Sequence, residues 1–292
     1  MQALDRAATF ATYALRGLQP DRKRCPNCGG RGPVLVRKYL VSTLRRCAAC
    51  QLMYRAPTDS QFESVDFYQE DYDEGATTAL PAPADLDALK RDGFPGMECD
   101  YSEYIRVLRH LGLAEGSRLF DFGCSWGYGS YQLAQAGFQV KSFEISRPRG
   151  HYGRDHLGVD LIDDLDRFVD QNESTFDAFF SAHVLEHVPS PSDAIETAFR
   201  LLRPGGLFVS CFPNGCDSYR RVNPGGWLTS WGKVHPNLID DRFLDEALRG
   251  HSGFLATTPV DVSGQRHATN VTGALVRCDP LERCELFVMA IK

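Results

Sequence analysis

A short apolar strand, a glycine turn and a helix follow one another in residues 118–135, and this succession constrains the fold more than any other segment. The mostly apolar residues 119–122 fit a buried strand, Gly123 ends it, and a helix begins near Ser130. In α/β proteins such a turn lies at the carboxyl end of a parallel strand, where nucleotides bind. Glu144, which ends the next predicted strand, follows Gly123 by 21 residues, a spacing typical of an acid that binds a ribose diol.

The glycine turn lacks the spacing that a dinucleotide requires. The pattern G-x-G-x-x-G lets the backbone approach a pyrophosphate, but Ser125 and Tyr128 occupy the second and third glycine positions. The sequence therefore argues against a nicotinamide cofactor. The remaining pattern is D-x-G-x-x-x-G over residues 121–127. It fits another kind of nucleotide-binding turn, or a purely structural strand-turn-helix with a solvated Glu144.

A second segment, residues 176–212, bears on the choice between a nucleotide-binding turn and a purely structural one. Residues 176–188 begin as an apolar run and end in polar groups, as a central parallel strand does. The apolar spacing then predicts an amphipathic helix over 192–202, and a Pro-Gly-Gly stop precedes an apolar strand over 207–212. Further strands are predicted at 161–162, as the third strand, and at 274–277 and 286–291, as a final antiparallel pair.

The pattern over 121–127 resembles the first motif of class I S-adenosylmethionine-dependent methyltransferases, usually written D-x-G-x-G-x-G, with Ser125 replacing the middle glycine. The wording F-D…H-V-L-E-H-V…L-L-R-P-G-G-L…P-N is similar to the fourth- and fifth-strand region of methyltransferases that modify small molecules, quinone precursors and sugars. The resemblance covers residues 115–212 well and the C-terminal portion loosely. It implies a Rossmann-like, doubly wound α/β fold, whose seven-stranded, mostly parallel sheet has an antiparallel last strand.

The resemblance also implies how S-adenosylmethionine is bound. In this family the glycine loop lies beside the methionine part of the cofactor, and the acid that ends the second strand, here Glu144, binds both ribose hydroxyls. One of Asp163 and Asp164 is expected to meet the adenine amino group. Tyr72 belongs to an aromatic segment that precedes the core in zinc-ribbon methyltransferases and helps cover the cofactor. The expected cofactor-binding residues are Asp121, Gly123, Cys124, Gly127, Glu144, Ile145, Asp163, Asp164, Leu165, His183 and Tyr72.

Two C-x2-C pairs, Cys25 with Cys28 and Cys47 with Cys50, enclose 18 residues, a spacing typical of a structural zinc site. Each pair places two thiolates on one tight turn, and two turns complete the tetrahedron that Zn²⁺ prefers. A unit of about 35 residues buries too little apolar surface to fold alone, so the metal would supply most of its folding energy. Four cysteine ligands leave no open position, which predicts a structural zinc; a thioredoxin-type dithiol is the alternative. A hairpin of residues 34–41 and 42–46 is expected between the pairs.

Positive charge is concentrated at the N-terminus. Residues 1–55 carry a net charge of +9 in a chain whose total is −6, so the remainder carries −15. A basic module suits an anionic partner such as a phosphate-bearing substrate, an acidic glycan, a membrane surface or RNA. Docking onto the chain's own acidic body is the alternative. The predicted divisions are an N-terminal helix over 1–20, the zinc ribbon over 21–56, a linker with covering helices over 57–114, and the methyltransferase core over 115–292 with an insertion at 213–250.

Composition bears on the compartment. Ten cysteines, several in predicted core strands, fit a reducing compartment better than a disulfide scaffold. No apolar run approaches the roughly 18 residues of a membrane-spanning helix, and residues 1–18 lack the apolar block of a secretory signal. We therefore expect a cytoplasmic protein whose oligomeric state the sequence leaves open.

Methyl transfer to a hydroxyl needs a positioned acceptor, exclusion of water and removal of a proton. Histidine is the expected base because its pKa lies near neutral pH. The candidates are His183, His187 and His235, of which we assign His235 as the base, with His187 and Glu186 beside it. Residues 183–187 also spell the inverted zinc-protease motif H-x-x-E-H, but that motif requires a helix, and Pro189 follows directly.

The same segment resembles small-RNA 2′-O-methyltransferases and quinone-pathway O-methyltransferases that use its Glu and His to hold a divalent ion. Mg²⁺ held by Glu186, His187 and His235 is therefore one alternative, and loop-shaping hydrogen bonds from Glu186 and His187 are the other.

The insertion supplies the clue to the acceptor. It interleaves aromatic and cationic residues, which suit a sugar or a phosphorylated acceptor, unless its tryptophans only pack on the core. These residues are Tyr219, Arg220, Arg221, Trp227, Trp231 and Lys233. The predicted function is methylation of a hydroxyl on a sugar, a nucleotide-linked sugar or a related natural-product or glycan acceptor. The runner-up is an RNA methyltransferase whose basic ribbon binds phosphates, and a non-catalytic cofactor-binding subunit, suggested by Ser125, is the third hypothesis.

Overall fold

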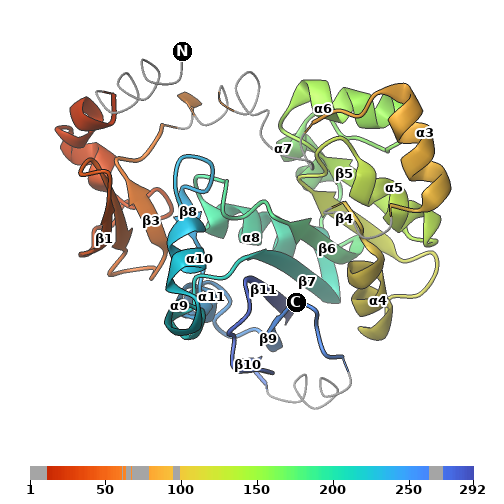
Figure 1. The fold of residues 1–292 in the computed structure, drawn as a ribbon. Helices are drawn as coiled ribbons and strands as arrows, with labels where there is room; N and C mark the ends of the chain where they lie inside the picture. The colour runs from red at the N-terminus through yellow and green to blue at the C-terminus, as the bar shows by residue number, and fades with distance from the viewer. Residues whose placement is uncertain (1–11, 61, 64–66, 68–78, 95–98, 263–271) are drawn as a thin grey trace.

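Among the described residues, seven strands form a central sheet in the order β10-β9-β11-β7-β6-β4-β5 (Figure 1). The structure is a computed structural model that describes residues 12–60, 62–63, 67, 79–94, 99–262 and 272–292. The strands of this sheet are β4 (Arg118–Phe122), β5 (Gln139–Phe143), β6 (Phe176–Ala182), β7 (Leu202–Pro213), β9 (Gly253–Thr257), β10 (Leu275–Arg277) and β11 (Glu285–Ile291). β11 runs antiparallel to β7 and β9, and the other pairings are parallel. The predicted fold class is confirmed.

The strand assignments at two places were wrong. β10 does not form an antiparallel pair with β11; it pairs in parallel with β9, because β11 lies between β9 and β7 and both of its edges are taken. The predicted third strand at residues 161–162 is reduced to one bridge between Ser142 and Leu161, since Asp164 already caps the next helix. β9, which the sequence analysis did not anticipate, brings the sheet to seven strands.

Helices cover both faces of the sheet. On one face α7 (Leu165–Gln171), α8 (Pro191–Leu201) and α11 (Asp241–Ala247) pack against strand residues that include Phe179. On the other face α4 (Ser102–His110) and α5 (Tyr128–Gln135) pack against residues that include Phe180. Neighbouring residues of a strand point to opposite faces, so this aromatic pair fills both halves of the core.

The remaining helical segments lie outside these two layers. They are residues 12–17, η1 (Pro20–Lys23), α3 (Pro83–Asp92), α6 (Arg147–Tyr152), η3 (Gly153–Leu157), α9 (Asp217–Val222) and α10 (Pro224–Thr229). No helix in the described part of the chain is long and apolar enough to cross a membrane. Most of the predicted N-terminal helix, residues 1–11, lies outside the described residues.

The N-terminal ribbon forms a second sheet with the order β1-β2-β3-β8. β1 (Val34–Lys38) and β2 (Ser42–Arg46) form the predicted antiparallel hairpin, and β3 (Met53–Ala56) extends it. The fourth strand, β8 (Asn237–Leu238), comes from the insertion and pairs with β3 (Figure 1). The ribbon and the insertion therefore share one sheet.

Candidate active site

The glycine loop after β4 touches the loop after β6. Gly123 and Gly127 have φ values of 86° and 87°, in the region that favours glycine. Both also permit close contacts: a Cβ at Gly123 would lie 2.3 Å from a methyl carbon of Val184, and one at Gly127 would lie 2.5 Å from a methyl carbon of Val159. Because Val184 belongs to the H-V-L-E-H segment, the fold brings the two sequence motifs into contact.

Glu144 is held against the glycine loop by backbone amides. Its Oε2 accepts a 2.8 Å hydrogen bond from the Ser125 N–H, and its Oε1 accepts a 2.7 Å bond from the Ser146 N–H. Burial raises the pKa of Glu144, and these amide bonds offset part of that effect. The adjacent Ile145 is 41% exposed, so an apolar side chain stands open next to the carboxylate. This arrangement suits a ribose and a flat base, as the resemblance implied.

Asp121 and Cys124 lie underneath the loop. Asp121 is 1% exposed and its Oδ2 accepts a 2.5 Å hydrogen bond from the Ser130 hydroxyl of α5. Burial and the nearby Glu144 raise the pKa of Asp121 to about 7, against the effect of Ser130. Cys124 is also buried, and its N–H donates to the carbonyl of Phe143. The Asp121 side chain thus ties the loop to α5, and the backbone of Cys124 ties it to β5.

The two candidate carboxylates for the adenine amino group differ in their surroundings. Asp164 caps α7, and its Oδ1 accepts a 3.0 Å hydrogen bond from the Arg167 N–H. Asp163 is exposed, with a 3.9 Å ion pair to Arg154. Asp163 is therefore the freer of the two, and Leu165 is the first residue of α7. Tyr72 lies outside the described residues.

Trp126, which the sequence analysis left without a role, anchors the segment that precedes the core. It is 1% exposed and lies against Phe94 and Tyr128, with ring centroids 6.3 and 4.9 Å away. The same apolar cluster includes Leu86 of α3. The ring therefore packs α3 next to the glycine loop.

Glu186 is a buried carboxylate surrounded by histidines. It is 1% exposed, and Oε1 lies 3.4 Å from His183 Nδ1 and 3.9 Å from His187 Nε2. Neither carboxylate oxygen accepts a hydrogen bond within the described part of the chain. Burial raises the pKa of Glu186, but the three histidines His183, His187 and His235 more than offset this and hold it below the ordinary value.

In both His187 and His235, Nδ1 lies close to a backbone carbonyl oxygen. His187 Nδ1 lies 2.9 Å from the Val234 carbonyl oxygen, and His235 Nδ1 lies 3.2 Å from that of Ser230. A carbonyl only accepts, so each Nδ1 carries a proton, and in the neutral ring Nε2 is then the nitrogen with the lone pair. Burial lowers the pKa of His187 to about 4, which keeps this imidazole neutral at neutral pH.

The structure brings together the three residues predicted for catalysis. The rings of His187 and His235 lie 4.7 Å apart, edge to face. One nitrogen or oxygen atom from each of Glu186, His187 and His235 lies within 4.8 Å of the others. The cluster can remove a proton or hold a cation.

His183 has surroundings that the sequence did not reveal. Its Nε2 lies 3.2 Å from Oε1 of Glu285 on β11, and the same oxygen accepts a 2.7 Å hydrogen bond from the Tyr104 hydroxyl. Burial lowers the pKa of His183, but Glu186 and Glu285 outweigh it and raise the pKa to about 10. The raised pKa favours the charged form of His183 at neutral pH and so disfavours this residue as a base. The only sequence signal for Glu285 was an acid that opens an apolar strand.

The aromatic residues of the insertion do not line an open surface. Tyr219, Trp227 and Trp231 are at most 4% exposed, and they form a cluster with Leu44 and Met53 of the ribbon. The expectation that these rings stack on a sugar was wrong, because the ribbon covers them. Arg220 lies over the Trp227 ring, and Lys233 lies over Phe67.

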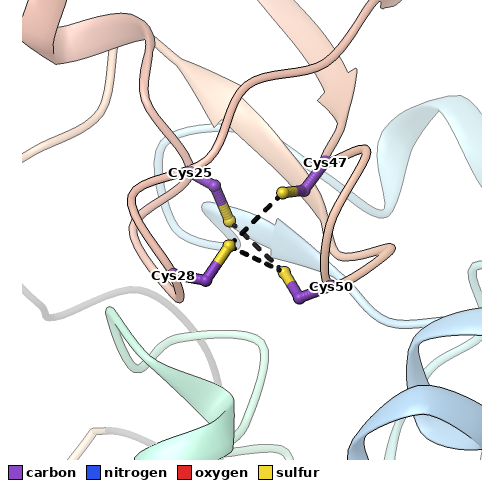
Figure 2. Close-up of side chains that lie close together, drawn as sticks. All are labelled: Cys25, Cys28, Cys47 and Cys50. Carbon is purple, nitrogen blue, oxygen red and sulfur yellow. Dashed lines mark hydrogen bonds between the residues drawn. The ribbon is translucent and has the colours of Figure 1, made fainter.

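The four cysteines of the ribbon converge on one point (Figure 2). The Sγ atoms of Cys28 and Cys47, and those of Cys28 and Cys50, are 3.4 Å apart, and those of Cys25 and Cys50 are 3.6 Å apart. A zinc tetrahedron with bonds of roughly 2.3 Å has edges of about 3.8 Å, so the donor set and its spacing fit Zn²⁺. The predicted cysteine cluster is confirmed.

Comparison with known proteins agrees with this geometry. A family model described as a methyltransferase domain matches residues 97–254, more than half of the chain. A ubiquinone biosynthesis O-methyltransferase of Alkalilimnicola ehrlichii is 32% identical over 109 residues, which cover 35% of this chain and 44% of that protein. Its counterpart from a Caulobacter species is 29% identical over 160 residues, which cover 51% and 62%. The chain thus spans less than two thirds of the length of either relative.

A solved structure shows the same fold. The magnesium protoporphyrin IX methyltransferase of Synechocystis, with bound S-adenosylmethionine, superposes with a TM-score of 0.50 over 80% of this chain and 97% of that one, at 16% identity. The family match contains the glycine loop, Glu144 and the histidine cluster in one continuous region. The chain belongs to the S-adenosylmethionine-dependent methyltransferases.

Proposed function

We propose that this enzyme methylates a hydroxyl of a small-molecule acceptor, with His235 as the general base. The observation that carries the proposal is the cluster of Glu186, His187 and His235, in which the loop of Glu186 and His187 touches the glycine loop through Val184 and Gly123. A base for an O-methyltransferase must lie close to the cofactor and keep a lone pair at neutral pH. Nδ1 of His235 lies 3.2 Å from the Ser230 carbonyl oxygen, so Nε2 is the nitrogen left to accept a proton.

Different residues of the site bind the cofactor, remove the proton and stabilise the charge that results. Bound S-adenosylmethionine supplies an electrophilic methyl group on a sulfonium. Glu144 grips the ribose, and Ile145 and Asp163 lie where the resemblance places the adenine. With the cofactor bound, Nε2 of His235 would take the hydroxyl proton as the acceptor oxygen accepts the methyl group, and S-adenosylhomocysteine would leave. Glu186, buried next to both imidazoles, stabilises the imidazolium that results.

We favour a phenolic hydroxyl of a quinone precursor over a sugar hydroxyl as the acceptor. The relatives are named for ubiquinone biosynthesis. The rings that suggested a sugar are buried against the ribbon. A glycan or nucleotide-linked sugar hydroxyl is the second acceptor to test.

An RNA acceptor is less well supported. Five arginines of the basic module form ion pairs within the described part of the chain, and one of these pairs, between Arg46 and Asp240, reaches the insertion of the methyltransferase core. Arg16 pairs with Asp59 and Glu63, Arg22 with Glu63, Arg24 with Asp21, Arg46 with Asp240, and Arg55 with Asp59.

A divalent cation is the alternative use of the same three side chains. Neither oxygen of Glu186 has a hydrogen bond within the described residues, and a carboxylate oxygen of Glu186 and one ring nitrogen each of His187 and His235 lie within 4.8 Å of one another, a donor set that could bind a cation. Two imidazoles and one carboxylate suit a transition metal better than Mg²⁺, which prefers oxygen ligands. Such an ion would act as a Lewis acid on the acceptor hydroxyl.

The test compares His235→Ala with His110→Ala, a control at the exposed end of α4. Methyl transfer is measured by mass spectrometry on a catechol, a nucleotide-linked sugar and an RNA. We expect His235→Ala to lose roughly 10²-fold in turnover with the catechol, and to bind S-adenosylhomocysteine as the wild type does by calorimetry. Wild-type turnover in His235→Ala would reject the base. Loss of activity after chelation that leaves the zinc of the four cysteines bound, restored by Mn²⁺, would assign the cation to the Glu186 cluster.

A further inference from the structure

The ribbon is hydrogen-bonded to the segment that carries His235. Tyr54 of β3 is paired with Asn237 of β8, and the ladder continues where the Arg55 N–H donates a 2.7 Å hydrogen bond to the Pro236 carbonyl. Pro236 directly follows His235. β3 begins three residues after Cys50, so the path from the cysteine cluster to the candidate base is short.

Asn237 connects the same strand to the Glu186 loop. It is fully buried; its backbone N–H donates to the Glu186 carbonyl at 3.1 Å, and its Nδ2 donates to the Val188 carbonyl at 2.6 Å. A two-residue strand has little stability of its own, because its few hydrogen bonds do not offset the conformational entropy that the loop loses when it is ordered. β8 therefore depends on β3 for its position.

The first cysteine turn reaches the other end of this loop. Asn27 lies between Cys25 and Cys28; its Oδ1 accepts a 2.8 Å hydrogen bond from the Ser192 N–H, and its Nδ2 donates to the Ser192 hydroxyl at 2.9 Å. The Ser190 hydroxyl also donates to Asn27 Oδ1. The start of α8, just after the Glu186 loop, is thus capped by the cysteine turn.

We propose that the four-cysteine ribbon positions the catalytic cluster: Asn27 and β3 hold the Glu186 loop and His235 from two sides. Asn27 and Asn237 are positioning residues in this arrangement, and the inference rests on the proposed role of His235. The metal that fits the cysteines would fix the turn that carries Asn27 and the start of β3. Cofactor binding should be independent of the ribbon, since the bonds that hold Glu144 come from Ser125 and Ser146.

Amide hydrogen exchange on the full chain tests this without a known acceptor. The reporters are the N–H groups of Asn237 and Arg55, and the internal control is Cys124, whose N–H donates to Phe143 at 3.0 Å. The samples are wild type, wild type after zinc chelation, Asn27→Ala and Asn27→Asp, each assayed for bound zinc. Leu40→Ser, at the 86% exposed tip of the ribbon hairpin, is the matched control.

In zinc-loaded Asn27→Ala, we expect exchange at Asn237 to accelerate roughly tenfold or more, with Cys124 unchanged. Asn27→Asp should restore most of the protection, because it keeps the acceptor for Ser190 and Ser192. Chelation should expose Asn237 and Arg55 together. S-adenosylhomocysteine should bind with unchanged affinity throughout, and this readout separates the proposal from the enzyme's cofactor chemistry.

Two results would overturn the proposal. One is wild-type protection of Asn237 in Asn27→Ala. The other is chelation that exposes the ribbon amide of Cys47, which donates to Leu52, while Asn237 stays protected. Once the acceptor is known, the proposal also requires Asn27→Ala to lower kcat with little change in the KM for S-adenosylmethionine. Failure of His235→Ala to lower turnover would reject the base and leave the exchange result intact.

Discussion

The backbone N–H of Ser125 donates a 2.8 Å hydrogen bond to Oε2 of Glu144. The residue that departs from the glycine pattern is therefore the one that orients the acid expected to bind the ribose. A backbone donor does not depend on the side chain, so a serine can replace the glycine without loss of this contact. The same bond makes Glu144 sensitive to a change in its acceptor atoms.

Glu144→Gln should weaken binding of S-adenosylmethionine. The amide group has one acceptor oxygen where the carboxylate has two, so either the Ser125 or the Ser146 N–H loses its partner. We expect the Kd to rise roughly tenfold or more, by calorimetry. Glu196→Gln, exposed on α8, is the control and should bind normally. Equal affinity in the two variants would contradict the assignment of the ribose site.

Ser125→Gly should stabilise the protein slightly. Ser125 has a φ of 51°, which costs a non-glycine residue about 1–2 kcal/mol, and the extra freedom of glycine in the unfolded chain costs roughly 0.5–1 kcal/mol. The net gain is about 0.5 kcal/mol, measurable by urea unfolding. Ser117→Gly, at a residue without positive φ, should change stability in the opposite direction.

Gly30→Ala should weaken metal retention by the ribbon. A Cβ at Gly30 would lie 2.9 Å from the Cys47 sulfur and 3.3 Å from the Cys28 sulfur, too close for the cluster to keep its spacing. Gly17→Ala adds a Cβ that meets no atom within 4 Å and serves as the control. A chromogenic chelator should remove zinc faster from Gly30→Ala only. Indistinguishable release rates would show that the cluster tolerates the added methyl group.

Glu63→Gln should make the stability of the protein depend less on pH between pH 6 and pH 3. Burial raises the pKa of Glu63, but the Ser60 N–H, Arg22 and Arg16 together lower it to about 2. A carboxyl whose pKa is lowered by folding stabilises the fold above its ordinary pKa of about 4.5, and this contribution disappears as the pH falls toward 2. Urea midpoints measured between pH 6 and pH 3 should fall less steeply in Glu63→Gln than in wild type. Parallel curves would contradict the assignment.

The sequence predicted those parts of the fold whose information is local. The β4 turn, α8 and the two cysteine pairs are each specified by residues within a short window, and the structure confirms all three. β9 escaped prediction because Gly253–Thr257 is a short apolar run, which periodicity cannot assign to a strand or a helix. Its partners β10 and β11 come later in the chain, and only the folded sheet shows where they lie.

The residues of the candidate site were likewise predicted where the information is local and missed where it comes from distant parts of the chain. Glu186 and His187 were found because they share one motif, and His235 because it lies in a long insertion. Glu285 was missed because it joins His183 from a strand far along the chain. The burial of Trp227 and Trp231 was one of the two alternatives that the sequence left open. That the ribbon covers them was not predicted, because the ribbon residues lie near the other end of the sequence.

β8 of the insertion pairs with β3 of the ribbon. We therefore expect these two segments to evolve together, although they lie far apart in the sequence. Loss of the cysteine turns would leave β8 without its partner strand. A shorter insertion would leave one edge of β3 unpaired, and an unpaired strand edge promotes aggregation. Related sequences should therefore gain or lose the four cysteines together with the Trp231-to-Leu238 stretch. A survey of homologues in which the two vary independently would show that the shared sheet is dispensable.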